Sequence, residues 1–122
     1  MANSDMKKSK VGYEFYKYEN EDTVQYHYHN TCIVEHIKGK EYVVLNTGGY
    51  ITATTKNKIN QALKMLGIPV KVFQRNFYWY INNYAVGRDD NYLYNNGMKI
   101  TFFGSVVTNM NHRHERRVKA EG

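Results

Sequence analysis

Hydrophobic and polar residues alternate along several short stretches of the chain, and this two-residue period is typical of β-strands buried on one face. In residues 23–29, Val24, Tyr26 and Tyr28 alternate with Gln25, His27 and His29. The same kind of pattern predicts strands at 11–18, 32–37, 41–45, 70–75, 77–81 and 98–103. Residues 32–37 and 41–45 flank a short turn and are expected to form a hairpin. Only Asn76 separates 70–75 from 77–81, which favours a bulge in one long strand.

One segment has the period of a helix. Its apolar residues recur at i, i+3, i+4 and i+7: Ile59, Ala62, Leu63 and Leu66. Thr54 or Thr55 is expected to cap its N-terminus, and Gly67 followed by Pro69 marks its end. This predicts one amphipathic helix over about 55–66. The face opposite the apolar stripe, expected to point away from the core, carries Lys56, Asn60 and Lys64.

The remaining segments are polar. Residues 1–10 are interpreted as a flexible arm, 82–97 as a long loop rich in Asn, Asp and Gly, and 109–122 as a basic tail. The strands and the helix together predict a single α+β domain over 11–108. We expect an antiparallel sheet of five or six strands with the helix on one face.

The formal charge of +6 is unevenly distributed. Between residues 55 and 88 there is no Asp or Glu, and the bases are Lys56, Lys58, Lys64, Lys71, Arg75 and Arg88. A local excess of bases attracts polyanions, whereas bases interspersed with acids mainly aid solubility. The alternative is that these residues form an ordinary solvated helix face.

The sequence shows no sign of a membrane span, a secretory signal or an internal disulfide. No apolar run approaches the roughly 20 residues of a membrane helix, and the N-terminal residues lack the apolar core of a secretory signal. Cys32 is the only cysteine, so no internal disulfide can form. These features predict a cytoplasmic protein with no membrane partner.

The central motif is Leu45-Asn46-Thr47-Gly48-Gly49-Tyr50-x-Thr52-x-Thr54-Thr55-Lys56. Together with His29-Asn30-Thr31, Trp79-Tyr80 and Gly97-Met98, it resembles a small domain of unknown function that recurs in bacteriophage proteins. Tyr50 and Lys58 depart from the residues common there, Trp and Arg. The resemblance implies a phage origin and the host-cell cytoplasm, and it implies no activity.

The same motif is a candidate polyanion site. Gly48 and Gly49 let the backbone approach a ligand closely, and Thr54 and Thr55 lie where the helix N-terminus favours negative charge. The P-loop pattern is absent. The alternative interpretation is a tight turn followed by a capped helix.

The tyrosines are a second candidate. Tyr78 and Tyr80, with Tyr26 and Tyr28, would form a platform on which unpaired bases stack if the uncovered sheet face carries them. The alternatives are that tyrosines simply suit strands, or that this face is buried in a partner protein or a homodimer.

Metal binding and catalysis have little support. His27, His29, Cys32 and His36 are close in sequence, but only one thiolate is present, and ordinary strand histidines are the better explanation. No arrangement of a nucleophile and a base can be argued. We therefore expect no metal, no cofactor and no enzymatic activity.

The leading hypothesis is a small phage-encoded protein that binds nucleic acid, a single strand or RNA rather than a specific duplex. Its proposed binding residues are Gly48, Gly49, Thr54, Thr55, Lys56, Lys58, Lys64, Lys71, Arg75 and Tyr80. The alternative hypothesis is an anti-defence or host-takeover inhibitor that binds a host protein or a nuclease complex.

Overall fold

A computed structural model describes residues 6–107 of the chain. It contains one helix, α1 (Ala53–Met65). The strands in chain order are β1 (Lys7–Gly12), β2 (Phe15–Glu19), β3 (Thr23–Tyr28), β4 (Thr31–Ile37), β5 (Tyr42–Leu45), β6 (Val70–Arg75), β7 (Tyr78–Asn83), β8 (Asn91–Leu93), β9 (Lys99–Thr101) and β10 (Val106–Val107). The predicted α+β class with one helix is confirmed.

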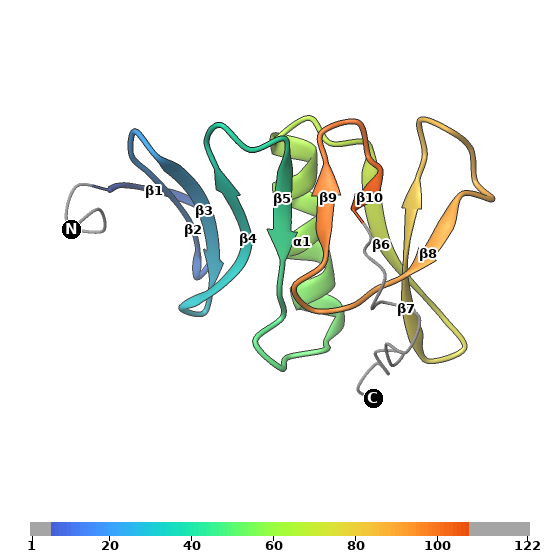
Figure 1. The fold of residues 1–122 in the computed structure, drawn as a ribbon. Helices are drawn as coiled ribbons and strands as arrows, with labels where there is room; N and C mark the ends of the chain where they lie inside the picture. Colours follow the sequence, from blue (N-terminus) through green and yellow to red (C-terminus); the bar gives the residue numbers. More distant parts are fainter. Residues whose placement is uncertain (1–5, 108–122) are drawn as a thin grey trace.

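The strands form two antiparallel sheets instead of one (Figure 1). The larger has seven strands in the order β1-β2-β3-β4-β5-β9-β10, and the smaller has three in the order β6-β7-β8. Three strands lie where none was predicted: β1 begins inside the expected N-terminal arm, β8 lies inside the expected polar loop, and β10 follows the last predicted strand. Strand β1 pairs through its backbone while most of its side chains stay exposed, so its sequence has no apolar alternation. Residues 1–5 and the tail 109–122 lie outside the described part of the chain.

Strands β6 and β7 form a hairpin, so the expectation of one long bulged strand was wrong. The two-residue loop is Asn76-Phe77, with φ of 52° and 70°. Positive φ at both loop residues is the geometry of a type I′ turn, which follows the twist of the flanking strands. The Gly preferred at the second loop position is absent, so this turn was not recognised from the residue pattern. The two-residue loop between β3 and β4, His29-Asn30, also has positive φ at both residues, 50° and 67°.

Helix α1 begins slightly earlier than predicted, and its N-cap is Thr52 rather than Thr54 or Thr55. The backbone of Thr52 is extended, and its Oγ1 accepts a hydrogen bond from the Thr55 backbone N–H at 3.3 Å. At the other end, the Ile68 N–H donates to the Leu63 carbonyl, and Gly67 adopts φ of 77°. This is the expected glycine termination.

The helix lies behind the centre of the larger sheet (Figure 1) and also packs against β6. Both sheets and the helix contribute to one continuous hydrophobic core. Its largest fully buried side chains include Trp79, Tyr26, Tyr94, Phe15 and Leu63. Val24, Tyr26 and Tyr28 share one face of β3, as predicted, and this face points into the core.

Candidate nucleic-acid interface

The smaller sheet has one face in the core and one face outward. Phe73 lies opposite Tyr80, which lies opposite Leu93 on the next strand, and Arg75 lies opposite Tyr78. Residues directly opposite each other project from the same face of a sheet. The alternate positions on β6 and β7, among them Val72 and Trp79, are buried in the core. The outward face, called here the β6–β8 face, therefore carries Lys71, Phe73, Arg75, Tyr78, Tyr80 and Leu93.

Aromatic and basic side chains contact one another on this face. The rings of Phe73 and Tyr80 stack with 5.6 Å between centroids and an interplanar angle of 25°. The guanidinium carbon of Arg75 lies 5.4 Å from the centroid of the Phe73 ring. Both rings are half-buried while Lys71 and Arg75 are exposed. The face thus combines stacked rings with exposed cations.

Phe77 stands at the tip of the β6–β7 hairpin, immediately after Arg75 and Asn76. Its side chain is 61% exposed although its backbone has φ of 70°. A bulky residue rarely adopts positive φ, and backbone strain of this kind often accompanies functional positions. The ring is therefore a further candidate contact at the edge of the β6–β8 face.

The helix adds bases next to β6. The Asn60 side chain donates to the Val72 carbonyl at 2.9 Å and accepts from the Val72 N–H at 2.6 Å, which fixes this face of α1 against β6. The expectation that Asn60 points away from the core elements was wrong. Lys56 and Lys64 lie one helical turn before and after Asn60, so they share the side of α1 that packs against β6. Lys71 and Arg75 lie on β6 itself.

Lys58 lies elsewhere. Its Nζ is 5.3 Å from the ring centroid of Phe15 and 5.8 Å from that of Tyr28, and its side chain is half-buried beside β2 and β3. Lys58 lies two positions before Asn60, which places the two side chains on opposite sides of the helix. The structure thus divides the predicted bases between two sides of α1.

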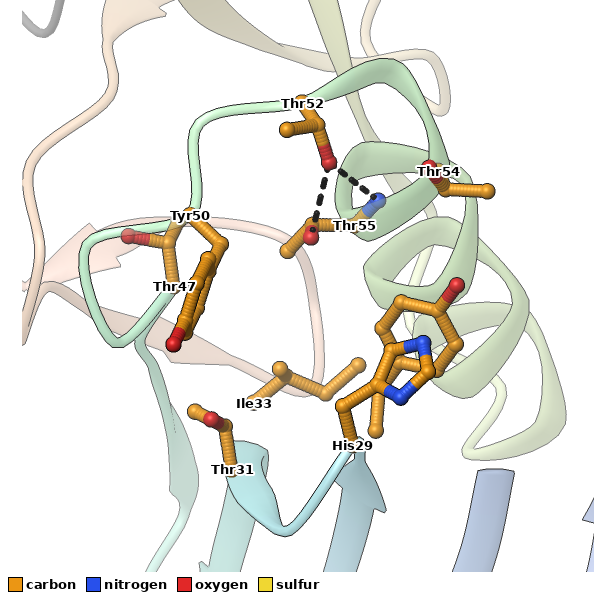
Figure 2. A pocket seen from close by; sticks show the side chains of 9 residues that line it. His29, Thr31, Ile33, Thr47, Tyr50, Thr52, Thr54 and Thr55 are labelled. Carbon is orange, nitrogen blue, oxygen red and sulfur yellow. Dashed lines mark hydrogen bonds between the residues drawn. The ribbon is translucent and has the colours of Figure 1, made fainter. Parts of the chain in front are cut away.

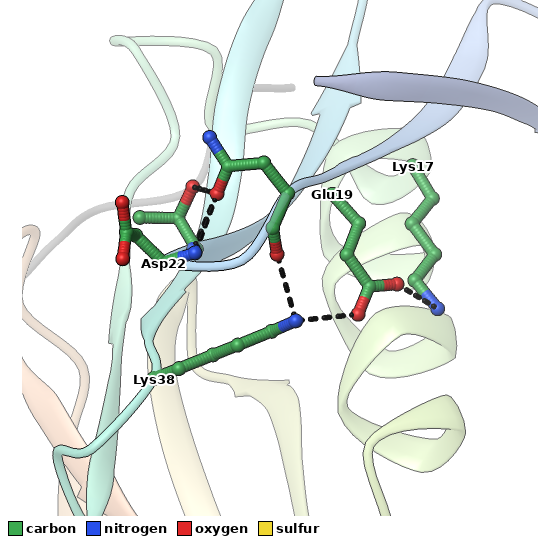
Figure 3. A network of polar contacts seen from close by, with 6 residues as sticks. Lys17, Glu19, Asp22 and Lys38 are labelled. Atoms are coloured by element: carbon green, nitrogen blue, oxygen red, sulfur yellow. Dashed lines mark hydrogen bonds and ion pairs between the residues drawn. The ribbon is translucent and has the colours of Figure 1, made fainter. Parts of the chain in front are cut away.

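One acidic residue, Glu19, forms ion pairs with two lysines that lie outside the basic run. At the β2–β3 turn, Glu19 contacts Lys38 at 2.9 Å and Lys17 at 3.3 Å (Figure 3). The hydrogen bonds from Lys38 and Lys17 lower the pKa of Glu19. Within residues 6–107, the bases between 55 and 88 make no ion pair within 4.0 Å. Their charge is not cancelled by a neighbouring carboxylate of the described chain.

The glycine pair of the central motif forms a tight turn. The Gly48 N–H donates to Asn46 Oδ1 at 2.8 Å, and the Gly49 N–H donates to Thr47 Oγ1 at 3.1 Å. A Cβ at Gly48 would come within 2.6 Å of Thr31 Cγ2, so the turn also needs a close approach to β4. The two amides are engaged within the turn, which matches the structural alternative considered for this motif.

The predicted four-tyrosine platform does not form. Tyr26 is 1% exposed and Tyr28 packs against the core, whereas Tyr78 and Tyr80 belong to the other sheet. Sequence reasoning missed Phe73 and Phe77 as neighbours of Tyr80. Alternation in 70–75 already placed Phe73 on one side with Lys71 and Arg75, and this signal could have identified it.

The histidines and the cysteine have separate surroundings. His27 Nε2 lies 2.8 Å from Gln25 Oε1, while His36 Nε2 lies 2.9 Å from the Lys40 carbonyl. Burial raises the pKa of the Cys32 thiol to about 12. Among residues 6–107, no group of three or more His, Cys, Asp or Glu side chains has the arrangement of a metal site.

The comparisons with known proteins give a family. In residues 6–107, no helix is long and apolar enough to span a membrane. No curated protein and no solved structure matches the chain. Residues 1–101 match a bacteriophage protein family described as Kyanoviridae Gp96 protein, which confirms the expected resemblance to a phage domain. Because this match spans most of the sequence, the chain belongs to the Kyanoviridae Gp96 protein family.

Proposed function

We propose that this phage protein binds nucleic acid through the β6–β8 face, in the host-cell cytoplasm and without catalysing a reaction. The observation that carries the proposal is the contact between stacked rings and unpaired cations on one outward face. Phe73 and Tyr80 offer ring surface, and Lys71 and Arg75 lie on either side of Phe73 along the same strand. Rings hold bases and cations hold the phosphate backbone in proteins that bind single strands.

The preferred ligand is an unpaired strand, DNA or RNA. Stacking requires bases that are free of their own neighbours, and these are found in single strands and RNA loops. The helix bases Lys56 and Lys64, which lie on the side of α1 that packs against β6, extend the positive region along α1. Phosphate contacts of this kind carry no sequence information, so we expect weak base preference.

Fluorescence anisotropy of labelled single-stranded and double-stranded oligonucleotides, at two salt concentrations, tests this function. We expect tighter binding of the single strand and a fall in log K of about 0.7 per neutralised phosphate as log salt rises. The variant Lys71→Glu with Arg75→Glu should lose most of the affinity. Affinity that does not change with salt would contradict the proposal.

A matched control separates the face from the overall charge. Lys7 and Lys40 are exposed and lie on other parts of the structure, on β1 and in the β4–β5 turn. Lys7→Glu with Lys40→Glu changes the net charge by the same amount as the test variant. We expect it to keep most of the affinity, and an equal loss in both variants would contradict a localised binding face.

A host protein or nuclease complex is the second candidate partner. Exposed apolar side chains favour it, because Tyr84, Val86 and Phe103 are 52%, 71% and 82% exposed, and Asn83 donates to the Phe103 carbonyl at 3.3 Å. Exposed apolar patches commonly mark protein interfaces. Capture of one stoichiometric protein from nuclease-treated host lysate, lost in Phe103→Ser, would favour this partner. Loss of all partners after nuclease treatment favours nucleic acid.

A further inference from the structure

A pocket of about 370 Å³ lies between the β3–β4 turn, the Gly48–Gly49 turn and the N-terminus of α1 (Figure 2). Tyr50 lies on one side of this pocket, and His29 with Tyr28 lies on the other. Ile33 lies between them, and the other lining residues are threonines. The volume is at the small end of the range for pockets that bind small molecules.

Neighbouring aromatic rings pack against the side of the pocket opposite Tyr50, which is formed by Tyr28 and His29. The ring centroids of Tyr28 and His29 are 4.3 Å apart. The rings of Tyr13 and His29 are in an edge-to-face arrangement with 6.4 Å between their centroids. The tight turn described above positions Tyr50, whose N–H donates to the Thr47 carbonyl at 3.1 Å. The Tyr50 side chain is 60% exposed. A flat ligand stacked on the Tyr50 ring would have His29 across the pocket from it (Figure 2).

The polar groups of the pocket are mainly threonine hydroxyls. Among the described residues that line it there is no Lys, Arg, Asp or Glu, and hydroxyls of Thr54 and other threonines supply hydrogen-bonding groups. Lys58 lies just outside, beside Tyr28, at 5.8 Å from its ring centroid. The pocket therefore suits an uncharged planar ring with polar edges, with a cation available for an attached phosphate.

We propose that this pocket binds a nucleobase, with its ring stacked on Tyr50 and its edge toward the side of the pocket formed by Tyr28 and His29. A nucleobase is planar, uncharged and polar at its edges, and stacking of bases on aromatic side chains is a general mode of recognition. The base belongs to a free nucleotide or to an unpaired position of a strand. The site goes beyond the proposed function, because it shares no residue with the β6–β8 face.

Calorimetric titration with the four ribonucleoside 5′-monophosphates tests the site, with ribose 5-phosphate as the probe that lacks a base. We expect at least one monophosphate to bind and ribose 5-phosphate to bind far more weakly. Tyr50→Ala should weaken binding roughly 5- to 150-fold, the effect of losing one stacked ring. Tyr50→Phe, which keeps the ring, should restore it.

Tyr84→Ala is the matched control, because Tyr84 is similarly exposed, at 52%, and does not line the pocket. We expect it to bind like the unchanged protein. If the monophosphates do not bind but Tyr50→Ala weakens binding of a single-stranded oligonucleotide, the base comes from a strand and the proposal stands. Equal binding of ribose 5-phosphate, or unchanged binding of every probe in Tyr50→Ala, would overturn it.

The proposed β6–β8 face and the proposed nucleobase pocket can be tested separately. Lys71→Glu with Arg75→Glu tests the β6–β8 face and leaves all pocket residues in place. Loss of oligonucleotide binding in that variant, with monophosphate binding kept, would support both sites. Oligonucleotide binding that depends on the β6–β8 charges, together with unchanged binding of every probe in Tyr50→Ala, overturns the pocket alone.

Discussion

Phe77 combines a strained backbone with an exposed ring. Its φ of 70° costs a non-glycine residue about 1 kcal/mol, yet its side chain is 61% exposed and gains little from burial. Its neighbour Asn76 has the matching positive φ of 52°. A strained position that contributes little to the core is expected where the side chain has another role, and contact with nucleic acid is the role proposed for its surroundings.

We therefore predict that Phe77→Gly stabilises the protein and weakens oligonucleotide binding. The substitution creates the Asn-Gly pair that type I′ turns favour, so the free energy of unfolding should rise by about 1 kcal/mol. Urea denaturation can be followed through Trp79, the single tryptophan, which is fully buried. If the variant is less stable, the backbone of Phe77 is not strained. If its affinity for the oligonucleotide is unchanged, the Phe77 ring does not contact nucleic acid.

Gly48 shows a different constraint, in which space and backbone conformation act together. It has φ of 64°, and a Cβ there would meet Thr31 Cγ2 at 2.6 Å. Gly49 has φ of 91° with nothing within 4 Å. We predict that Gly48→Ala lowers the free energy of unfolding by about 2 kcal/mol or more, and Gly49→Ala by about 1 kcal/mol.

Denaturation of these variants in parallel measures the difference. Thr31→Ser removes the methyl group that the new Cβ would meet, so it should recover part of the loss when combined with Gly48→Ala. Equal losses for the two glycine substitutions would show that the contact with Thr31 has no energetic consequence.

At the scale of elements, Asn60 joins α1 to the edge of the smaller sheet. Strand β6 is an edge strand, and the two hydrogen bonds from Asn60 occupy the outward N–H and carbonyl of Val72. A side chain thus takes the place of a neighbouring strand. This explains a polar residue on a helix face that borders the core, because unpaired edge groups promote association with other chains.

We predict that Asn60→Ala lowers the free energy of unfolding by about 2 kcal/mol. Two hydrogen bonds of about 1 kcal/mol each are lost, and the better helix propensity of Ala offsets a small part. Gln61→Ala, at an exposed helix position, is the control and should change stability by less than about 0.5 kcal/mol. A loss no larger than that of the control would show that these bonds do not hold α1 to β6.

At the scale of the whole molecule, buried titratable groups limit stability on both sides of neutral pH. Burial lowers the pKa of His27 below 6.5, so the unfolded chain binds a proton that the folded chain does not, and stability falls as pH drops below about 6.5. Burial raises the pKa of Cys32 to about 12 from 9.0, and also raises that of Tyr94. Stability therefore falls as pH rises above about 9.

We expect the free energy of unfolding to be highest between about pH 7 and 9. Each alkaline group contributes a slope of at most about 1.4 kcal/mol per pH unit over its range. Urea denaturation across pH 5 to 11 measures the curve. His27→Gln should reduce the loss of stability below about pH 6.5 and leave the loss above pH 9 unchanged. If the variant loses as much stability at acid pH as the unchanged protein, groups other than His27 cause that loss.

Local patterns in the sequence anticipated a good part of this structure. The i, i+3, i+4, i+7 spacing of Ile59, Ala62, Leu63 and Leu66 identified α1, because the positions of side chains around a helix follow from its period. Alternation likewise identified β3 and the residues that share a face on it, but not that this face points into the core. The strands that were missed, β1, β8 and β10, each pair with a neighbouring strand in the chain, and they are short or mostly exposed, so their side chains show no clear period.

The acid-free run of bases, the tyrosine content, the α+β class and the phage motif could all be derived from the amino-acid sequence alone, because each depends on residues close together in the chain. The tertiary structure decided which of those residues meet. It divided the strands between two sheets, placed Lys71, Phe73, Arg75 and Tyr80 on one face, and moved Tyr26 into the core. It also brought Tyr28, His29 and Tyr50 around one pocket. These arrangements depend on pairing and packing between segments far apart in the chain, and a local pattern does not encode them.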